Sequence, residues 1–248
     1  MKTLFVGKNS FAFEQLDSTN DWLLEQCNEA SLMEGLVVRA IDQKKGKGQR
    51  GALWLSQSDK SLCFSILLKP KFLSTSQNFQ LSLCVALGVY DCLSELRPGF
   101  SIKWPNDIYF ENKKIAGILI ENQFRKSTYQ NAVVGIGLNI NQNKFNALPN
   151  AISLKQIIGI ELTIESVLER LCETIEARYL QLRSGKHLKQ KSDYLSHLFR
   201  FDKWDRYKIG EELFLAKIVD VLPNGRLCLN FENGSINDYD IKEVTFEL

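Results

Sequence analysis

Apolar residues recur at helical spacing in four stretches of the chain, and each stretch has plausible boundaries. Residues 77–96 and 163–183 are the longest, and the first ends at an Arg-Pro-Gly sequence that begins at Arg97. Residues 18–29 open with a capping-box spacing, and residues 153–158 stop at a glycine. We therefore predict four helices over these ranges.

Short apolar runs separated by turn residues predict strands between the helices. The turns contain Pro-Asn, Glu-Asn and Arg-Lys-Ser sequences, which favours a meander of antiparallel strands in the middle of the chain. The predicted strands are residues 36–41, 62–68, 101–104, 107–110, 115–123 and 128–140.

From about Tyr207 the chain changes to short strands alone, with turns at Pro-Asn-Gly and Asn-Gly sequences. This texture predicts a small β barrel appended to a larger α+β domain in which helices cover a mixed or antiparallel sheet. We place the boundary so that residues 1–198 form the first domain and residues 199–248 the second.

Composition restricts the functional class only broadly. The chain has 248 residues, 44% apolar and 24% charged, and a net charge of +2, which excludes disorder and favours neither a nucleic-acid nor a membrane partner. The longest apolar run, residues 81–93, is too short to cross a bilayer, and no signal-peptide pattern precedes it, so we expect a cytoplasmic protein. Six cysteines without a CxxC pair, and two distant histidines, predict neither disulfides nor a zinc site.

The segment from Lys44 to Gly51 carries the sharpest chemical signal, because it holds three glycines and four cations in eight positions after a predicted strand. Glycines allow backbone amides to approach a ligand and cations neutralise an oxyanion, so the segment suits a phosphate or a carboxylate. A solvated turn is an equally good interpretation of the composition. The spacing matches neither a P-loop nor a dinucleotide-binding fingerprint.

Four further segments combine polar side chains or glycines at positions where a ligand could lie. Each also has a purely structural interpretation: residues 17–20 (DSTN) as a helix cap, 103–107 (KWPND) as a turn, 113–117 (KKIAG) as a solvated hairpin, and 133–139 (VVGIGLN) as a strand against a packed helix. Taken singly, none of them decides between ligand binding and structure.

Together and in this order, DSTN, Gln43 with KKGKGQRG and Trp54, KWPND, KKIAG and GIGLNIN resemble the motif series of biotin protein ligases. The resemblance extends from about Phe11 to Asn141. It implies an α+β catalytic domain of the class II synthetase-like biotin/lipoate ligase type, followed by an SH3-like barrel. It also implies a two-step reaction, in which biotin and ATP with Mg²⁺ give biotinyl-5'-AMP and a lysine of a biotin carboxyl carrier protein then takes the biotinyl group.

The resemblance also assigns roles to residues. Lys114, Asp107 and Arg50 would be catalytic, with Lys114 on the biotin carboxylate and Asp107 orienting or deprotonating the acceptor lysine. Biotin would be bound by Ser18, Thr19, Asn20, Gln43, Gly46, Lys47, Gly48, Gln49, Lys114, Gly117 and Gly135. ATP would be bound by Lys47, Arg50, Trp54, Lys103, Asn106 and Asn139, with the metal near Asn139.

The chain departs from the family's usual glycine-rich loop, which commonly reads GRGRRG. Lys47 and Gln49 stand where arginines are common, and Ala52 stands at a third such place. Lysine lacks the bidentate fork of arginine and glutamine is neutral, so we expect a weaker hold on the adenylate unless Arg50 compensates.

The sequence leaves three other interpretations to compare with this one. A lipoate protein ligase or lipoyl/octanoyl transferase shares the fold, although the basic glycine-rich loop favours biotin. A regulator with an N-terminal DNA-binding domain is not expected, because DSTN begins at residue 17, and a catalytically inactive binding module is not favoured because Lys114, Asp107 and the glycine loop are present. We expect a monomer or a homodimer.

Overall fold

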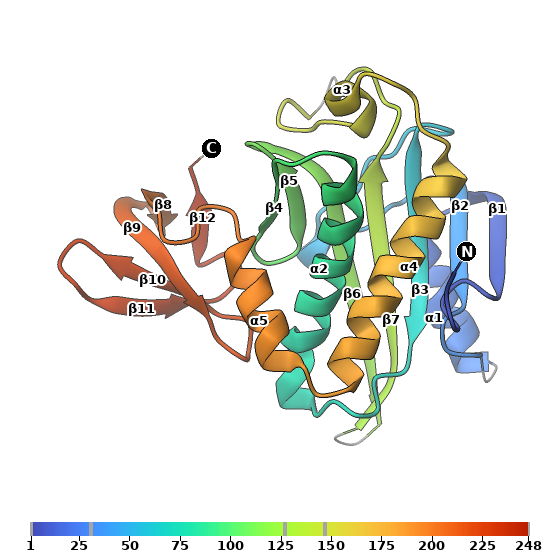
Figure 1. Ribbon diagram of the computed structural model, residues 1–248, viewed down its shortest axis with the longest axis horizontal. Coiled ribbons are helices and arrows are strands. Elements are labelled where there is room, and N and C mark those ends of the chain that lie inside the picture. The colour runs from blue at the N-terminus through green and yellow to red at the C-terminus, as the bar shows by residue number, and fades with distance from the viewer. Residues whose placement is uncertain (1, 30–31, 126–127, 146–147, 248) are drawn as a thin grey trace.

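The computed structural model describes residues 2–29, 32–125, 128–145 and 148–247. Within these ranges the chain forms a seven-stranded sheet with helices on both faces, and a five-stranded sheet at one end of the molecule (Figure 1). The predicted α+β class and the predicted all-β C-terminal region are both confirmed.

The larger sheet has the strand order β1-β2-β3-β7-β6-β5-β4. β1 and β2 are parallel and are joined through the first helix, while all the other neighbours are antiparallel. β3 is buried at every position, because it lies between two strands and under helices. The bounds are β1 (Ser10–Leu16), β2 (Val37–Gln43), β3 (Ser61–Leu68), β4 (Phe100–Lys103), β5 (Asp107–Phe110), β6 (Lys113–Arg125) and β7 (Thr128–Asn139).

Helices cover both faces of this sheet. α2 (Asn78–Leu96) and α4 (Ile164–Arg183) pack on one face, α5 (His187–Ser196) packs beside them, and α1 (Thr19–Glu29) lies on the opposite face (Figure 1). A short α3 (Leu154–Ile158) follows β7. The stretch Thr75–Leu96 is long and apolar enough to cross a membrane, but more than half of it is buried here, as in the core helix of a globular domain.

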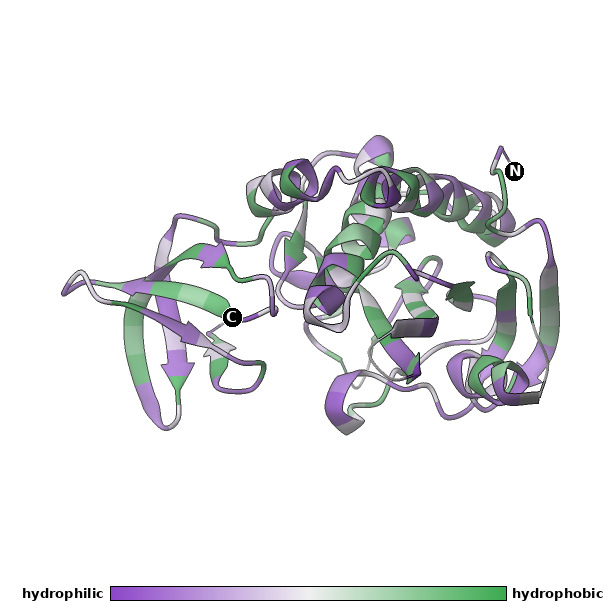
Figure 2. Cartoon of the chain, turned by 90° about the horizontal axis from the view of Figure 1, so that it is seen from below, coloured by the Kyte–Doolittle hydropathy of each residue, from purple (hydrophilic) through white to green (hydrophobic). Residues whose placement is uncertain are grey.

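The C-terminal sheet is antiparallel throughout, with the order β11-β10-β9-β8-β12. Figure 2 shows it as a separate lobe at the end remote from the N-terminus. Its bounds are β8 (Trp204–Ile209), β9 (Glu212–Val221), β10 (Leu227–Phe231), β11 (Ile236–Tyr239) and β12 (Val244–Phe246). The arrangement is compatible with an SH3-like barrel.

The two lobes share one hydrophobic cluster, in which Tyr207, Ile218 and Leu229 of the C-terminal sheet continue the core around α2. The Trp104 indole also donates a 2.8 Å hydrogen bond to the carbonyl of Gly225. Apolar burial is the main stabilising contribution to such contacts, so the C-terminal lobe is held firmly against the larger one. The predicted division after residue 198 falls between α5 and β8, and remains a prediction.

The structure contains each predicted helix and strand, with ends that differ by at most a few residues. It also contains two elements that we did not predict, β1 and α5. β1 is an edge strand that is largely exposed, and α5 has only two buried residues, Gln190 and Tyr194. Neither therefore carries the apolar periodicity from which elements are recognised.

Candidate active site

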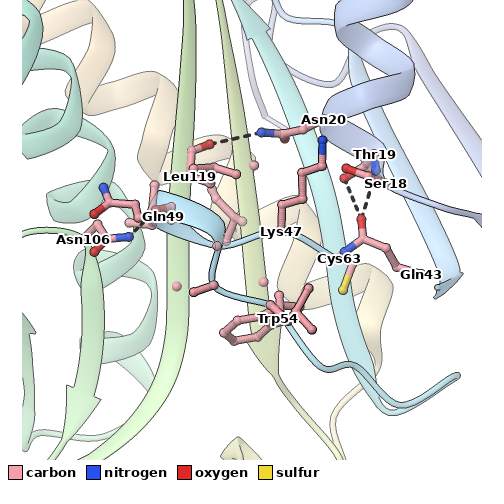
Figure 3. A pocket seen from close by; sticks show the side chains of 18 of the residues that line it. Ser18, Thr19, Asn20, Gln43, Lys47, Gln49, Trp54, Cys63, Asn106 and Leu119 are labelled. Carbon is pink, nitrogen blue, oxygen red and sulfur yellow. Dashed lines mark hydrogen bonds between the residues drawn. The ribbon is translucent and has the colours of Figure 1, made fainter. Parts of the chain in front are cut away.

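A cavity opens between the larger sheet and the glycine-rich loop that follows β2 (Figure 3). Its floor is formed by β3, β6 and β7, one end by the start of α1, and its cover by residues 47–54. The segments that the sequence singled out, widely separated along the chain, therefore meet around one space.

The start of α1 forms the polar end of the cavity. The backbone amide and the hydroxyl of Thr19 both donate to Gln43 Oε1, at 2.9 and 3.2 Å. Ser18 Oγ accepts from the amide of Asp21 as a helix cap. The cap interpretation and the site interpretation of the DSTN segment are thus both correct, since the residues that begin the helix also face the cavity.

The side-chain amide of Asn20 is held from three sides. Its Oδ1 accepts from Ser65 Oγ at 2.6 Å, and its Nδ2 donates to Glu121 Oε2 at 2.7 Å and to the carbonyl of Leu119 at 3.4 Å. A hydrogen-bonded amide of this kind keeps one orientation. The polar end therefore presents fixed donors and acceptors.

Three glycines form the floor beneath these polar groups. A Cβ at Gly135 would lie 2.3 Å from Asn20 Oδ1, and one at Gly137 would lie 2.2 Å from Trp54 Cε2. At Gly117 the corresponding distance to Trp54 Cζ3 is 3.2 Å. Side chains from α1 and from the loop thus lie directly against the backbone of β6 and β7, which explains the glycine alternation that the sequence showed.

Lys114 stands at the edge of this floor, near the beginning of β6. Its Nζ lies 2.7 Å from Asp107 Oδ1 and 5.7 Å from the centre of the Trp54 ring. The lysine side chain is 35% exposed and the aspartate 17%, so the ion pair is partly withdrawn from water. An ammonium group in this position can bind an anion that enters the cavity.

A second cavity adjoins the first and shares Leu53, Trp54 and Lys114 with it. Tyr109 and Asn139 line it, together with residues 148–151, which we had not predicted to belong to the site. The two spaces meet at Lys114. A ligand in one cavity and a ligand in the other would therefore be in contact at this cation.

The glycine-rich loop is a short hairpin over the first cavity. Gly48 donates to the carbonyl of Ala52 at 2.7 Å, and Trp54 donates to the carbonyl of Gly46 at 2.9 Å. Lys47 Nζ lies 2.6 Å from Asp21 Oδ1, and this ion pair and hydrogen bond raise the pKa of Lys47. The loop thus places the ammonium of Lys47 at the cavity, where it pairs with Asp21 of α1.

The structure places most of the predicted site residues around the first cavity. These are Ser18, Thr19, Asn20, Gln43, Lys47, Gly48, Gln49, Trp54, Asn106, Asp107, Lys114, Gly117 and Gly135. Asn106 also donates to the carbonyl of Ile118 at 2.6 Å, which fastens its loop to β6. Gly46 lies just behind, because a Cβ there would meet Gln43 and the Trp54 carbonyl.

Three predicted residues lie away from that cavity. Arg50 points to the C-terminal lobe, where it pairs with Asp240 at 3.0 Å. Lys103 lies over the rings of Tyr109 and Phe246, and its burial lowers its pKa. Asn139 faces the second cavity and donates to the carbonyl of Ile152 at 3.1 Å.

Sequence reasoning missed several residues of the site. Ser65 and Cys63 alternate on β3 with residues of the main hydrophobic core, and Glu121 follows the KKIAG segment on β6; only their neighbours in space show their role. Burial raises the pKa of the Cys63 thiol to about 11, so it is a protonated wall residue. Gly137 was visible in the glycine alternation but received no role.

Among the described residues, no group of three or more His, Cys, Asp or Glu side chains could enclose a metal ion. Asp107 and Lys114 line the first cavity, and Lys114 and Asn139 line the second. One carboxylate and one amide fit a Mg²⁺ ion that keeps its other ligands from water and phosphate.

Comparison with known proteins identifies relatives of this arrangement. The model of the biotin/lipoate A/B protein ligase family matches residues 12–139, which is just over half of the chain. The bifunctional ligase/repressor BirA of Bacillus spizizenii is 30% identical over 94% of this chain and 73% of its own. The chain spans 62% of the similar protein of Bacillus subtilis, and 81% of the biotin–[acetyl-CoA-carboxylase] ligase of Mycobacterium tuberculosis, which is 27% identical.

A solved structure of similar extent is the biotin protein ligase of Aquifex aeolicus in complex with biotin and ATP. It is 30% identical, has a TM-score of 0.79, and the alignment covers 97% of this chain and 99% of that one. The similarity therefore includes the C-terminal lobe as well as the larger sheet.

Proposed function

The chain belongs to the biotin/lipoate A/B protein ligase family, and from this premise we propose that it is a biotin protein ligase that activates biotin with ATP and transfers it to a carrier-protein lysine. One observation carries the proposal: two cavities, one polar and one partly aromatic, meet at Lys114. The vitamin occupies the first cavity, and the nucleotide occupies the second.

The polar end of the first cavity selects biotin over lipoate. The ureido ring of biotin carries two N–H donors and one carbonyl acceptor, and Thr19, Asn20 and Gln43 present fixed hydrogen-bonding groups there. The dithiolane ring of lipoate has no such groups. A bound lipoate ring would leave without partners only those polar atoms here that have none within the protein, at a cost of about 1–3 kcal/mol for each buried group. The valeryl chain of biotin extends from this polar end toward Lys114.

In the first step, a carboxylate oxygen of biotin attacks the α-phosphorus of ATP. A bond forms between that oxygen and phosphorus, and the bond to the pyrophosphate oxygen breaks. Both reactants are anions, so the ammonium of Lys114 stabilises the pair and the transition state by neutralising charge at the junction. Asp107 and Asn139 would hold a Mg²⁺ ion bound with the ATP, and that ion would lower the effective charge of the phosphates.

In the second step, the amine of the acceptor lysine attacks the carbonyl carbon of biotinyl-5'-AMP, and AMP leaves. The attacking amine must first lose a proton, because an ammonium has no lone pair. Asp107, already within 2.7 Å of Lys114, accepts or directs that proton. The glycine-rich loop excludes water, which would otherwise hydrolyse the mixed anhydride.

The remaining assignments follow from position. Asn139 and Trp54 border the second cavity and contact the nucleotide. Lys103, which lies over the Tyr109 ring, and Asn106, which is bonded to β6, support the wall between the two cavities. Residues 1–198 constitute the catalytic domain, and residues 199–248 an SH3-like domain. ATP and carrier proteins are cytoplasmic reactants, so we place the reaction in the cytoplasm.

The test incubates the protein with Mg-ATP and an apo biotin carrier domain, with biotin or lipoate in parallel, and measures the mass of the carrier. We expect the biotinyl adduct alone. A lipoyl adduct without a biotinyl adduct would replace the proposal by lipoate ligation, and no adduct with either would refute both.

The variant Asp107→Asn separates the two steps. It should release pyrophosphate at close to the wild-type rate in the first turnover, and transfer to the carrier should be slowed at least tenfold at neutral pH. Equal slowing of both steps would refute the role of Asp107 in transfer.

A further inference from the structure

The tip of the glycine-rich loop contacts the C-terminal lobe through three polar bonds. Arg50 donates to the carbonyl of Ile241 and pairs with Asp240 Oδ1 at 3.0 Å. In return, Lys242 Nζ donates to the carbonyl of Arg50 at 3.3 Å. The contact is reciprocal, because each side gives a cation to a backbone carbonyl of the other.

Within the loop, a backbone bond from Gly48 to Ala52 and one from Ala52 to Gln49 close the turn at the tip, and the three bonds above join this turn to the C-terminal lobe. Arg50 has φ of +52° and Gly51 has φ of +83°, and a Cβ at Gly51 would meet nothing within 4 Å. A left-handed conformation is unfavourable for arginine, so external contacts must compensate for it. A cavity also lies beside the tip, with Gln49 on one wall and Asp240 and Ile241 on another.

The acceptor side of the contact is ordered independently of the loop. Glu243 accepts from the amide of Asp240 at 2.6 Å, and Asp240 Oδ1 accepts from the amide of Ile241, also at 2.6 Å. The C-terminal sheet is in turn fixed to the larger lobe by the shared core. The loop is thus fastened to a rigid support, although the support lies far along the chain.

We propose that Asp240 and Lys242 are positioning residues that latch the glycine-rich loop in its closed form, and thereby set how long the adenylate stays bound. They act through Arg50 and do not touch the substrates. Only the effect on how long the adenylate stays bound rests on the proposed function, because closure of the loop can be measured without any substrate. It assigns a catalytic consequence to the C-terminal lobe.

Exposed ion pairs are individually weak, and here the side chains are 40% and 52% exposed. A contact of this kind changes an equilibrium by about fivefold at most, so we expect that size of effect rather than loss of activity. A fivefold change can be measured both in the exchange rate of the loop amides and in the dissociation rate of the adenylate.

The first measurement is hydrogen exchange in the ligand-free protein, read at the amides of Gly48, Ala52 and Trp54, which bond within the loop. Asp240→Asn keeps an acceptor for the turn but removes the charge opposite Arg50. We expect about fivefold faster exchange at these amides in Asp240→Asn and in Lys242→Met.

The matched control is Asp238→Asn, which removes a charge from the same end of β11. Asp238 pairs with Arg226 and not with the loop. We expect wild-type exchange in the loop of this variant. Unchanged loop exchange in both latch variants, or equally fast exchange in the control, would overturn the latch.

The second measurement follows the loss of preformed biotinyl-5'-AMP from the protein after a chase with unlabelled adenylate. Asp240→Asn and Lys242→Met should shorten its half-life about fivefold, and Asp238→Asn should not. Faster exchange with an unchanged half-life would overturn the catalytic role of the latch. If the wild-type protein forms no adenylate, the proposed function fails, while the exchange result still decides whether the latch exists.

Discussion

The variant Gly135→Ala tests how the floor of the first cavity positions the vitamin. A methyl group at this position would lie 2.3 Å from Asn20 Oδ1, about 1 Å closer than a normal contact allows, so the amide must move. Moving it lengthens the 2.6 Å bond from Ser65 and the 2.7 Å bond to Glu121 beyond hydrogen-bonding distance. The only change in composition is one methyl group.

The magnitude follows from those two bonds. A neutral hydrogen bond contributes about 1 kcal/mol and one to a charged group about 1.5–3 kcal/mol, so the displaced amide loses about 2.5–4 kcal/mol. Part of this lowers the stability of the protein, and the rest appears in biotin binding. If about 2 kcal/mol is lost from binding, the dissociation constant for biotin rises roughly 30-fold.

The assay is isothermal titration with biotin, accompanied by a thermal unfolding curve that shows the variant to be folded. Ser65→Ala is the companion variant, because it removes one of the same bonds without adding volume. ATP binding should change less than twofold. Biotin affinity within twofold of the wild type in a folded Gly135→Ala protein would refute the placement of the ureido ring beside Asn20.

Three further predictions address the junction, the thiols and the N-terminal segment. Lys114→Ala should slow adenylate formation at least a hundredfold with an unchanged unfolding curve, as measured by pyrophosphate release; a loss below fivefold would contradict the role of the ammonium. Burial raises the pKa of Cys63 to about 11 and that of Cys92 to about 12, whereas a thiol in the unfolded chain has a pKa of about 8.5. The unfolded chain therefore loses these protons first as the pH rises. The stability that the two thiols contribute is complete below pH 8.5 and is lost as the pH rises through 11–12. Urea unfolding at pH 8 and pH 10.5 should therefore show a lower free energy of unfolding at pH 10.5, and equal values would contradict this. Glu176, 4% exposed, accepts three backbone amides of the N-terminal segment at 2.5–2.8 Å, so Glu176→Ala should lower the unfolding free energy by about 2–4 kcal/mol in thermal or urea unfolding; a change below 0.5 kcal/mol would show that these bonds are not stabilising.

The parts of the fold that the sequence predicts are those with a strong apolar period. α4 buries one face along its length, α2 is buried on all sides over residues 83–89, and β3 is buried throughout, so each is marked by its own apolar residues. β1 and α5 bury few side chains, and they take their structure from pairing with β2 and packing on α2. A local sequence pattern does not indicate such tertiary partners.

The residues of the site likewise fall into those that the sequence marks and those that it does not. Its loop and turn residues, such as Asn20, Gln43 and Lys114, occur in motifs with unusual composition, and the structure brings them together. Ser65 and Glu121 lie in ordinary strands and acquire their role only from the side chains opposite them. Arg50 was assigned to ATP from its motif, while its bond to Asp240 joins residues 190 positions apart, a contact that no local pattern could indicate.

The most direct test of the account is the native mass of the protein after incubation with biotin and Mg-ATP in the absence of any carrier. If cations at the junction of the two cavities join the two anions and the closed loop protects the product, the protein should carry one biotinyl-5'-AMP per chain, and Lys114→Ala should carry none. A wild-type protein that holds biotin and ATP as separate, unreacted ligands would contradict it.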